Sequence, residues 1–238
     1  YISPKHITVF AKPRERATVA ATAMNITHAP IHYRLPNPKK YSALLLTNDW
    51  GLLEQNSNYH FLSHHKNTIC LQESVIDFNP EAGRMLHCNF PVYQGLATLK
   101  NINLDKKIGA VIGNPRYEPL SPMAFPETMT VMLNVNFTYG IFEEVRESWV
   151  SEVLAVCDGF NLPHVISQHP RDKGVFDPEK VVKTNASSVH EVIISSAVLV
   201  TRFSSLIHEA ICLGRPVVYY NPHGEELIYD FEPDNICL

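Results

Sequence analysis

From Thr130 onward, short runs rich in β-branched residues alternate with stretches of helical periodicity. This alternation is typical of consecutive βα units, whose strands pair side by side in a parallel sheet. Five strands in this order predict a doubly wound sheet. The expected strands are 130–135, 164–167, 181–184, 197–201 and 217–220, and the expected helices are 143–156, 188–194 and 205–213.

A proline-rich segment precedes this half. Residues 114–126 contain four prolines, which do not fit a continuous helix or a central strand. We therefore expect an incomplete N-terminal α/β domain over 1–116 and a C-terminal Rossmann-like domain over 117–238. The chain starts without an initiator Met, so we expect a piece of a longer protein. The N-terminal elements expected are strands at 7–10, 43–46, 69–71 and 110–112 and helices at 15–24 and 81–88.

Composition excludes several classes of protein. With 45% hydrophobic and 18% charged residues the chain is globular, not disordered or collagenous. A net charge of -4 gives no nucleic-acid footprint, and every apolar run is far shorter than the roughly 18 residues of a membrane span. The five cysteines stand among apolar residues without CxxC pairs, which favours reduced thiols and a cytoplasmic location.

The loop after the strand at 197–201 is the strongest candidate for a ligand site, because parallel sheets bind ligands beyond the carboxyl ends of their strands. Ser204 and Ser205 start a helix, where hydroxyls, backbone N–H groups and the helix dipole favour a phosphate. Glu209 follows Ser205 by four residues on the same face and could accept hydrogen bonds from ribose hydroxyls. The alternative is a capping serine with a solvated glutamate.

Two further loops follow strands of the second half. Pro170 fixes the backbone so that His169 projects from the sheet edge beside Arg171, which suits a diphosphate or a leaving phosphate. A surface turn explains the same residues equally well. Asn136 and Thr138 could contact the donor phosphate or sugar, or cap the next helix.

Carboxylates that follow strands of the first half are candidates for a catalytic base or nucleophile. Asp49 and Glu73 have this placement, although each is also explained as a loop acid. His60 and His64 have the spacing of a helical metal-binding pair, but no further ligand is evident, so a surface cluster is favoured. We expect no metal and no cofactor beyond the donor nucleotide.

The residues His169-Pro170, Ser204-Ser205 and Glu209, within a βα half that a linker joins to another α/β half, resemble the donor-binding domain of GT-B glycosyltransferases. The resemblance is closest to bacterial enzymes with "HP" and "SS" motifs: sialyltransferases, Kdo transferases and CDP-glycerol transferases. The segment 113–116 is also similar to a Gly-Asn-Pro-Arg segment of capsule-type proteins. The resemblance covers about 108–225, and earlier residues by architecture only.

The resemblance implies a GT-B-like fold, with two Rossmann-like domains whose parallel sheets face a cleft. It implies that His169, Ser204 and Ser205 contact a cytidine nucleotide, that Glu209 holds the ribose, and that the catalytic carboxylate lies in the other domain. The implied activity is metal-independent transfer of Kdo or sialic acid from a CMP-activated donor to a bacterial surface glycan: O-antigen, capsule or lipooligosaccharide. A lipid-linked acceptor would require peripheral association with the inner face of the plasma membrane.

Three other interpretations stay open. Polyol phosphate transfer from CDP-glycerol uses the same two motifs. A UDP-sugar 2-epimerase shares the fold and carries a Glu on the corresponding helix, but that family usually has a Ser-Gly-Gly turn where this chain has Phe203-Ser204-Ser205. The non-enzymatic alternative is a truncated GT-B module that binds a glycan or a protein.

Overall fold

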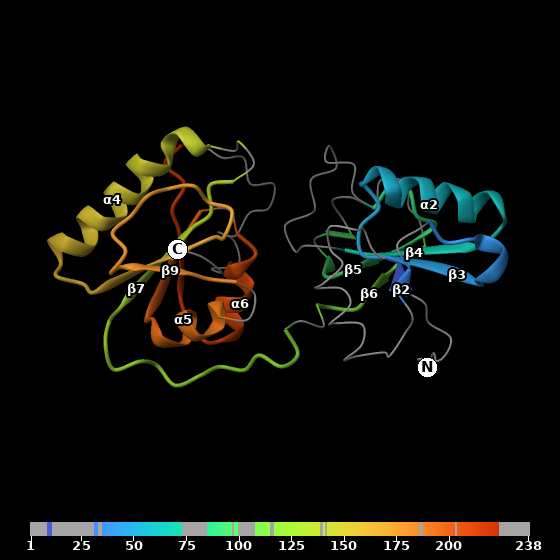
Figure 1. Ribbon diagram of the computed structural model, residues 1–238. Helices are drawn as coiled ribbons and strands as arrows, with labels where there is room; N and C mark the ends of the chain where they lie inside the picture. The colour runs from blue at the N-terminus through green and yellow to red at the C-terminus, as the bar shows by residue number, and fades with distance from the viewer. Residues whose placement is uncertain are drawn as a thin grey trace. The chain divides into compact units, whose positions relative to one another are not determined.

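The computed structural model describes residues 9–10, 31–32, 35–72, 85–96, 98–99, 108–114, 117–138, 140, 142–185, 188–202 and 204–223. These residues form two compact units, unit 1 up to Ile112 and unit 2 from Gly113. Each unit is built of helices and a parallel sheet (Figure 1). The predicted α/β fold class with two parallel sheets is confirmed.

Unit 2 contains a five-stranded parallel sheet in the order β11-β10-β7-β8-β9. Every strand and helix predicted for this half is present, with bounds within three residues of those expected, although the helix expected at 143–156 begins with a 3-10 turn. The elements are β7 (Val131–Val135), η5 (Glu143–Val145), α4 (Arg146–Gly159), β8 (His164–Gln168), β9 (Val181–Lys183), α5 (Val189–Ser195), β10 (Val198–Thr201), α6 (Leu206–Cys212) and β11 (Val217–Tyr219).

The strand order reverses between β7 and β10. The chain places β7 centrally, adds β8 and β9 on one side, and then returns to add β10 and β11 on the other. Asn134 and Thr201 are register partners near the carboxyl ends of β7 and β10, and Asn134 Nδ2 donates to Thr201 Oγ1 at 2.9 Å. In open parallel sheets, a ligand binds beyond the carboxyl ends at such a reversal.

Side chains of β7 alternate between two hydrophobic cores. Leu133 packs in one core with Trp149 of α4, and Met132 packs in the other with Ile193 of α5 and Ile207 of α6. Because successive residues of a strand point to opposite faces, α4 covers one face of the sheet and α5 and α6 cover the other (Figure 1). This packing fixes β7 and thereby the start of the loop that follows it.

Unit 1 contains a four-stranded parallel sheet in the order β3-β4-β5-β6 and a separate parallel pair, β1-β2. Neither β2, β5 nor α2 was predicted. The helix predicted at 81–88 is wrong where it is described, because 85–88 form a turn in which Met85 has a φ of 61°. The helix predicted at 15–24 lies outside the described residues. The elements are β1 (Val9–Phe10), β2 (Ile31–His32), η3 (Pro38–Lys40), β3 (Ala43–Leu46), α2 (Leu52–Ser63), β4 (Asn67–Leu71), β5 (Phe90–Tyr93) and β6 (Ala110–Val111).

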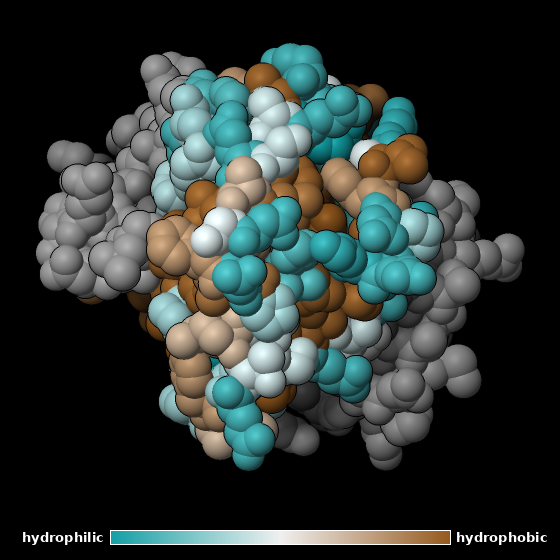
Figure 2. Space-filling model, turned by 90° about the vertical axis from the view of Figure 1, so that its left-hand side faces the viewer, coloured by the Kyte–Doolittle hydropathy of each residue, from teal (hydrophilic) through white to brown (hydrophobic). Residues whose placement is uncertain are grey.

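The surface drawn in Figure 2 mixes brown, hydrophobic areas with teal, hydrophilic side chains. Exposed apolar side chains of unit 2 include Val156 of α4, Phe160 directly after α4, and Val175 of the loop after β8. Single exposed side chains of this kind are common on folded proteins and need no ligand to explain them. Within the described parts of the chain, no helix combines the length and apolar content that crossing a membrane requires.

Candidate functional site at the carboxyl edge of the unit 2 sheet

Three loops begin at the same edge of the unit 2 sheet. They follow β7, β8 and β10, which are neighbours and run in parallel, so their carboxyl ends lie together. All of the residues predicted to bind the donor in unit 2, apart from Glu209 on α6, lie in these loops: Asn136, Thr138, His169, Pro170, Arg171, Ser204 and Ser205.

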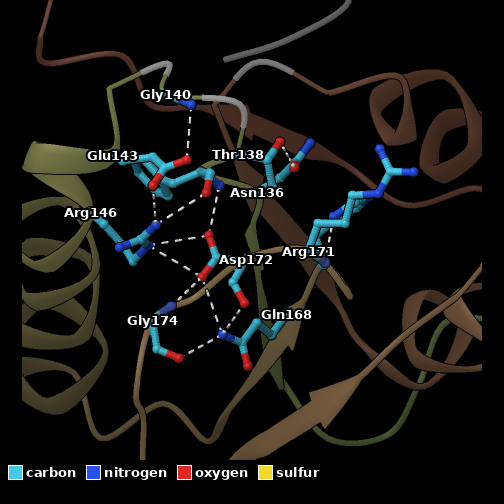
Figure 3. Close-up of polar contacts among 11 residues, drawn as sticks. Asn136, Thr138, Gly140, Glu143, Arg146, Gln168, Arg171, Asp172 and Gly174 are labelled. Carbon is cyan, nitrogen blue, oxygen red and sulfur yellow. Dashed lines mark hydrogen bonds and ion pairs between the residues drawn. The ribbon is translucent and has the colours of Figure 1, made fainter.

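The Asp172 carboxylate joins the loops after β7 and β8 (Figure 3). Its Oδ2 accepts the backbone N–H of Phe137 at 2.8 Å and Nε–H of Arg146 at 3.2 Å. Its Oδ1 accepts the backbone N–H of Gly174 at 2.8 Å and Nε2–H of Gln168 at 3.1 Å. A buried carboxylate with this many donors is held in one orientation, so the two loops have a fixed relation to each other.

The His169 ring is oriented by its own loop. Its backbone N–H donates to the Val135 carbonyl at 2.9 Å, and its Nδ1 accepts the backbone N–H of Arg171 at 3.2 Å. Burial lowers the pKa of His169 below its ordinary 6.5, the Arg171 charge lowers it further, and Asp172 opposes both. The ring is therefore neutral at neutral pH. Because Nδ1 is an acceptor, the ring proton lies on Nε2, which is a hydrogen-bond donor.

Ser204 and Ser205 differ in their local bonding. Ser204 is buried, and its Oγ accepts the backbone N–H of Leu206 at 3.2 Å, which is the capping role considered as the alternative. A serine hydroxyl that accepts one bond still carries its own proton, which it can donate to an anion. Ser205 is partly exposed and its side chain makes no cap bond to α6.

Glu209 is buried on α6, with 4% of its surface exposed. Its Oε2 lies 2.5 Å from Nε2 of His190 in the first turn of α5. The solvated glutamate of the alternative interpretation is therefore wrong. No pattern in the sequence indicates His190 as this partner, because it comes 19 residues earlier and on another helix.

Arg202 is a second residue of this site that was not predicted. It directly follows β10 and is 4% exposed, and its Cζ lies 4.4 Å from the ring centroid of Phe137 and 5.3 Å from that of Phe142. Burial lowers the pKa of Arg202 to about 10, while Tyr219 and Glu144 oppose this shift, so the guanidinium is charged at neutral pH. It supplies positive potential where the strand order reverses. An arginine directly after an apolar strand was the available signal.

The loop after β7 has polar bonds of its own (Figure 3). Thr138 Oγ1 donates to Asn136 Oδ1 at 3.2 Å, and the backbone N–H of Gly140 donates to Glu143 Oε1 at 2.9 Å. Asn136 is partly exposed, whereas Thr138 is buried. Pro170 and Arg171 of the neighbouring loop are both exposed.

Of the two carboxylates predicted to be catalytic in unit 1, the structure describes only Asp49. Glu73 lies outside the described residues. Asp49 is 1% exposed: its Oδ1 accepts the backbone N–H of Met85 at 2.7 Å, and its Oδ2 accepts those of His87 at 2.8 Å and Cys88 at 3.2 Å. Its carboxylate closes the turn before β5, a geometry that favours a structural role over proton transfer with a substrate.

One group of described residues in unit 1 has the composition of a metal site. Ligand atoms of Asp49, Cys70 and Cys88 all lie within 4.8 Å of one another, and all three residues are buried. The same environment raises the pKa of Tyr93 to about 12, through burial first and then the charges of Cys88 and Asp49. The Asp49 oxygens in this group are those that hold the 85–88 turn.

The His60 and His64 pair lies at the end of α2. The rings are in edge-to-face contact with centroids 4.9 Å apart, and the His64 Nδ1 lies 3.0 Å from the His60 carbonyl oxygen. His60 is exposed and His64 is partly exposed. This arrangement matches the surface cluster that the sequence favoured.

No protein-family model and no curated protein matches the sequence. Among solved structures, S. aureus MnaA in complex with UDP matches with a TM-score of 0.59 and 10% identity, covering 91% of this chain and 71% of that one. A "putative UDP-N-acetylglucosamine 2-epimerase" from Listeria monocytogenes matches with a TM-score of 0.52 and 10% identity, covering 90% and 71%. The β-Kdo 2,4 transferase KpsC of Thermosulfurimonas dismutans has a TM-score of 0.40 and 12% identity over 90% and 80%.

At these identities, structural similarity shows the fold and not the activity. The MnaA and Listeria matches each extend over at least 90% of this chain, and therefore over both units. The chain accordingly has a GT-B-like architecture, as the sequence predicted.

Proposed function

We propose that the protein is a glycosyltransferase that takes Kdo or sialic acid from a CMP-activated donor and transfers it to a bacterial surface glycan. The main support is the set of groups suited to a phosphate along the carboxyl edge formed by β10, β7 and β8. These are the Nε2–H donor of His169, the Ser204 hydroxyl and the buried Arg202 cation. Each comes from a loop that follows one of two strands neighbouring β7.

The chemistry follows from charge. When a sugar leaves CMP, negative charge develops on the phosphate, and prearranged hydrogen-bond donors and cations stabilise it. His169 is neutral because burial lowers its pKa, so it can donate a hydrogen bond as that charge develops. Ser205, Asn136 and Thr138 lie at the same edge and could complete the contacts to phosphate and sugar, with Glu209 binding the ribose.

The catalytic carboxylate of this proposal is Glu73. Asp49 is committed to three backbone donors in a buried turn, which leaves Glu73 as the stronger of the two candidates. It would act as a base on the acceptor hydroxyl in an inverting reaction, or as a nucleophile in a retaining one. A lipid-linked acceptor would bring the enzyme to the inner face of the plasma membrane.

The second candidate is a UDP-sugar 2-epimerase. One of the structures with a TM-score above 0.5 contains UDP, and the name of the other refers to this reaction. Against it stands the Phe203-Ser204-Ser205 segment, where the resemblance would require Ser-Gly-Gly.

A thermal-shift screen of the full chain with CMP, CDP, UMP and UDP tests the proposal. A ligand that binds only the folded state raises the melting temperature, so we expect CMP to give the largest shift. In calorimetry, Ser204→Ala and Ser205→Ala should each weaken CMP binding by about 1.5–3 kcal/mol, because each removes a hydrogen bond to a charged group. Ser195→Ala is the matched control, since Ser195 is exposed at the far end of α5 and bonds only locally to the Val192 carbonyl.

Each other outcome supports a different interpretation. A preference for UDP, with conversion of UDP-N-acetylglucosamine to its manno isomer in NMR spectra, would establish the epimerase. Transfer from CDP-glycerol would establish the polyol phosphotransferase. The absence of a shift with all four nucleotides would favour the non-enzymatic binding module.

A further inference from the structure

His190 and Glu209 connect two helices on the same face of the unit 2 sheet. Nε2 of His190 lies 2.5 Å from Oε2 of Glu209, and the two side chains are 29% and 5% exposed. His190 is the second residue of α5, and Glu209 is the fourth residue of α6. Because each helix follows a strand of the parallel sheet, their first turns lie at the carboxyl edge, where the candidate site is.

The burial of Glu209 explains why it needs a partner. Moving a carboxylate out of water is costly unless hydrogen bonds compensate it. The Glu209 charge affects the pKa values of two neighbours on α6. Burial lowers the pKa of His208, and the Glu209 charge opposes this shift. Burial raises the pKa of Cys212, and the Glu209 charge raises it further. His208 and Cys212 are thus neutral at neutral pH. The short contact from α5 therefore makes His190 an important donor to this carboxylate.

We propose that His190 is a positioning residue, which holds the Glu209 carboxylate in the orientation that accepts hydrogen bonds from the ribose hydroxyls of the donor nucleotide. This inference rests on the proposed function, because it assumes a nucleotide at this edge. A carboxylate offers about four acceptor positions, so the bond to His190 uses one and orients the others. The pair is open to solvent mainly through His190, whose side chain is 29% exposed against 5% for Glu209.

A positioning role makes a prediction that a purely structural role does not. If His190 acts through Glu209 on the ribose, its removal should weaken binding only of nucleotides that carry the ribose hydroxyls. If His190 only stabilises the packing of α5 on α6, its removal should weaken binding of every nucleotide equally. Comparing CMP with 2′,3′-dideoxy-CMP separates the two roles in the full chain.

We expect wild-type protein to bind CMP about tenfold more tightly than dideoxy-CMP in calorimetry, since ribose hydroxyls bonded to a carboxylate contribute on that scale. His190→Ala and Glu209→Gln should each reduce this preference to near unity, mainly by weakening CMP binding. His190→Gln keeps an N–H donor and should restore part of the preference. His164→Ala is the matched control, because His164 is partly exposed at the start of β8, the opposite edge of the sheet.

The remaining outcomes are distinguishable. Equal loss of affinity for both nucleotides in His190→Ala would overturn the positioning role, and so would an unchanged preference for CMP. Melting temperatures without ligand show whether each variant folds. If His190→Ala does not fold, the comparison of the two nucleotides is made with His190→Gln. Wild-type protein that binds neither nucleotide would overturn the proposed function itself, together with this inference.

Discussion

Arg146 and Asp172 form an ion pair between the partly exposed first residue of α4 and the buried carboxylate of the loop after β8. The Arg146 Nε lies 3.2 Å from both carboxylate oxygens of Asp172, whose side chain is 0% exposed. The Arg146 Nη2 also donates to the Phe137 carbonyl at 3.1 Å (Figure 3). One arginine therefore bonds to the loops after both β7 and β8, and so fixes two sides of the candidate site.

Asp172→Ala should lower the free energy of unfolding of unit 2 by about 3–5 kcal/mol, because the backbone donors of Phe137 and Gly174 lose their acceptor and Arg146 keeps only the weaker ion pair with the partly exposed Glu143 at 3.5 Å and the Phe137 carbonyl. Urea unfolding followed by fluorescence of Trp149, which is fully buried in unit 2, measures this loss. Asp177→Ala is the control, since Asp177 is exposed and accepts one local bond, from Glu179. Equal losses of unfolding free energy in the two variants would show that the ion pair contributes no more to stability than an exposed carboxylate does.

The sequence predicts unit 2 well because the hydrophobic pattern of each strand and helix is visible within its own segment. The run at β7 is apolar except for Asn134, and such nearly continuous apolar runs are typical of strands covered on both faces. The helix α2 shows the opposite case. Leu52 at its start is 74% exposed, whereas Asn58 is fully buried and its side chain donates to the His87 carbonyl. A helix that buries amides through bonds to a distant turn has no apolar periodicity to detect.

The candidate site was predictable only in part for a related reason. Residues that follow strands can be located from the pattern, which is how His169 and Ser204 were found. The pairing of Glu209 with His190 arises only when α5 and α6 pack together. The donors of Asp49 likewise lie 36 to 39 residues further along the chain, so its position after a strand gave no indication that it closes a turn.

Asp49→Asn tests whether this carboxylate is structural. The amide keeps one acceptor oxygen, so at least one of the backbone donors of Met85, His87 and Cys88 loses its partner. We expect unit 1 to lose about 1–3 kcal/mol of stability. Hydrogen exchange of the Met85 and Cys88 amides should accelerate. Loss of sugar transfer at unchanged stability and exchange would instead establish a catalytic role.

Acidification should destabilise unit 2 through His169 and His208. Burial lowers the pKa of both rings in the folded protein from the ordinary value of 6.5. As the pH falls below 6.5, the unfolded chain takes up protons that the folded protein does not, so the free energy of unfolding decreases until the lowered folded pKa is passed.

A His169→Gln/His208→Gln double variant should show a shallower dependence of unfolding free energy on pH below 6.5 than the wild type. Urea titrations at a series of pH values measure the slope of unfolding free energy against pH. The His208 ring stacks on Tyr117, and loss of this packing in the variant would lower stability equally at every pH, so it would not change the slope. A slope as steep as that of the wild type would show that burial of these rings does not control the acid response.

Arg202 gives the sharpest test of where the phosphate binds. Arg202→Met keeps an unbranched apolar side chain against Phe137 and Phe142 but removes the charge. We expect CMP binding to weaken by about 1.5–3 kcal/mol and to become less sensitive to salt. Arg202→Lys should be intermediate, because an ammonium keeps the charge but loses the planar stacking of the guanidinium. Lys183→Met is the control, since Lys183 is exposed at the end of β9. If both methionine variants bind CMP with the affinity and salt dependence of the wild type, Arg202 only fastens the loop after β7, and the phosphate must be held by other groups.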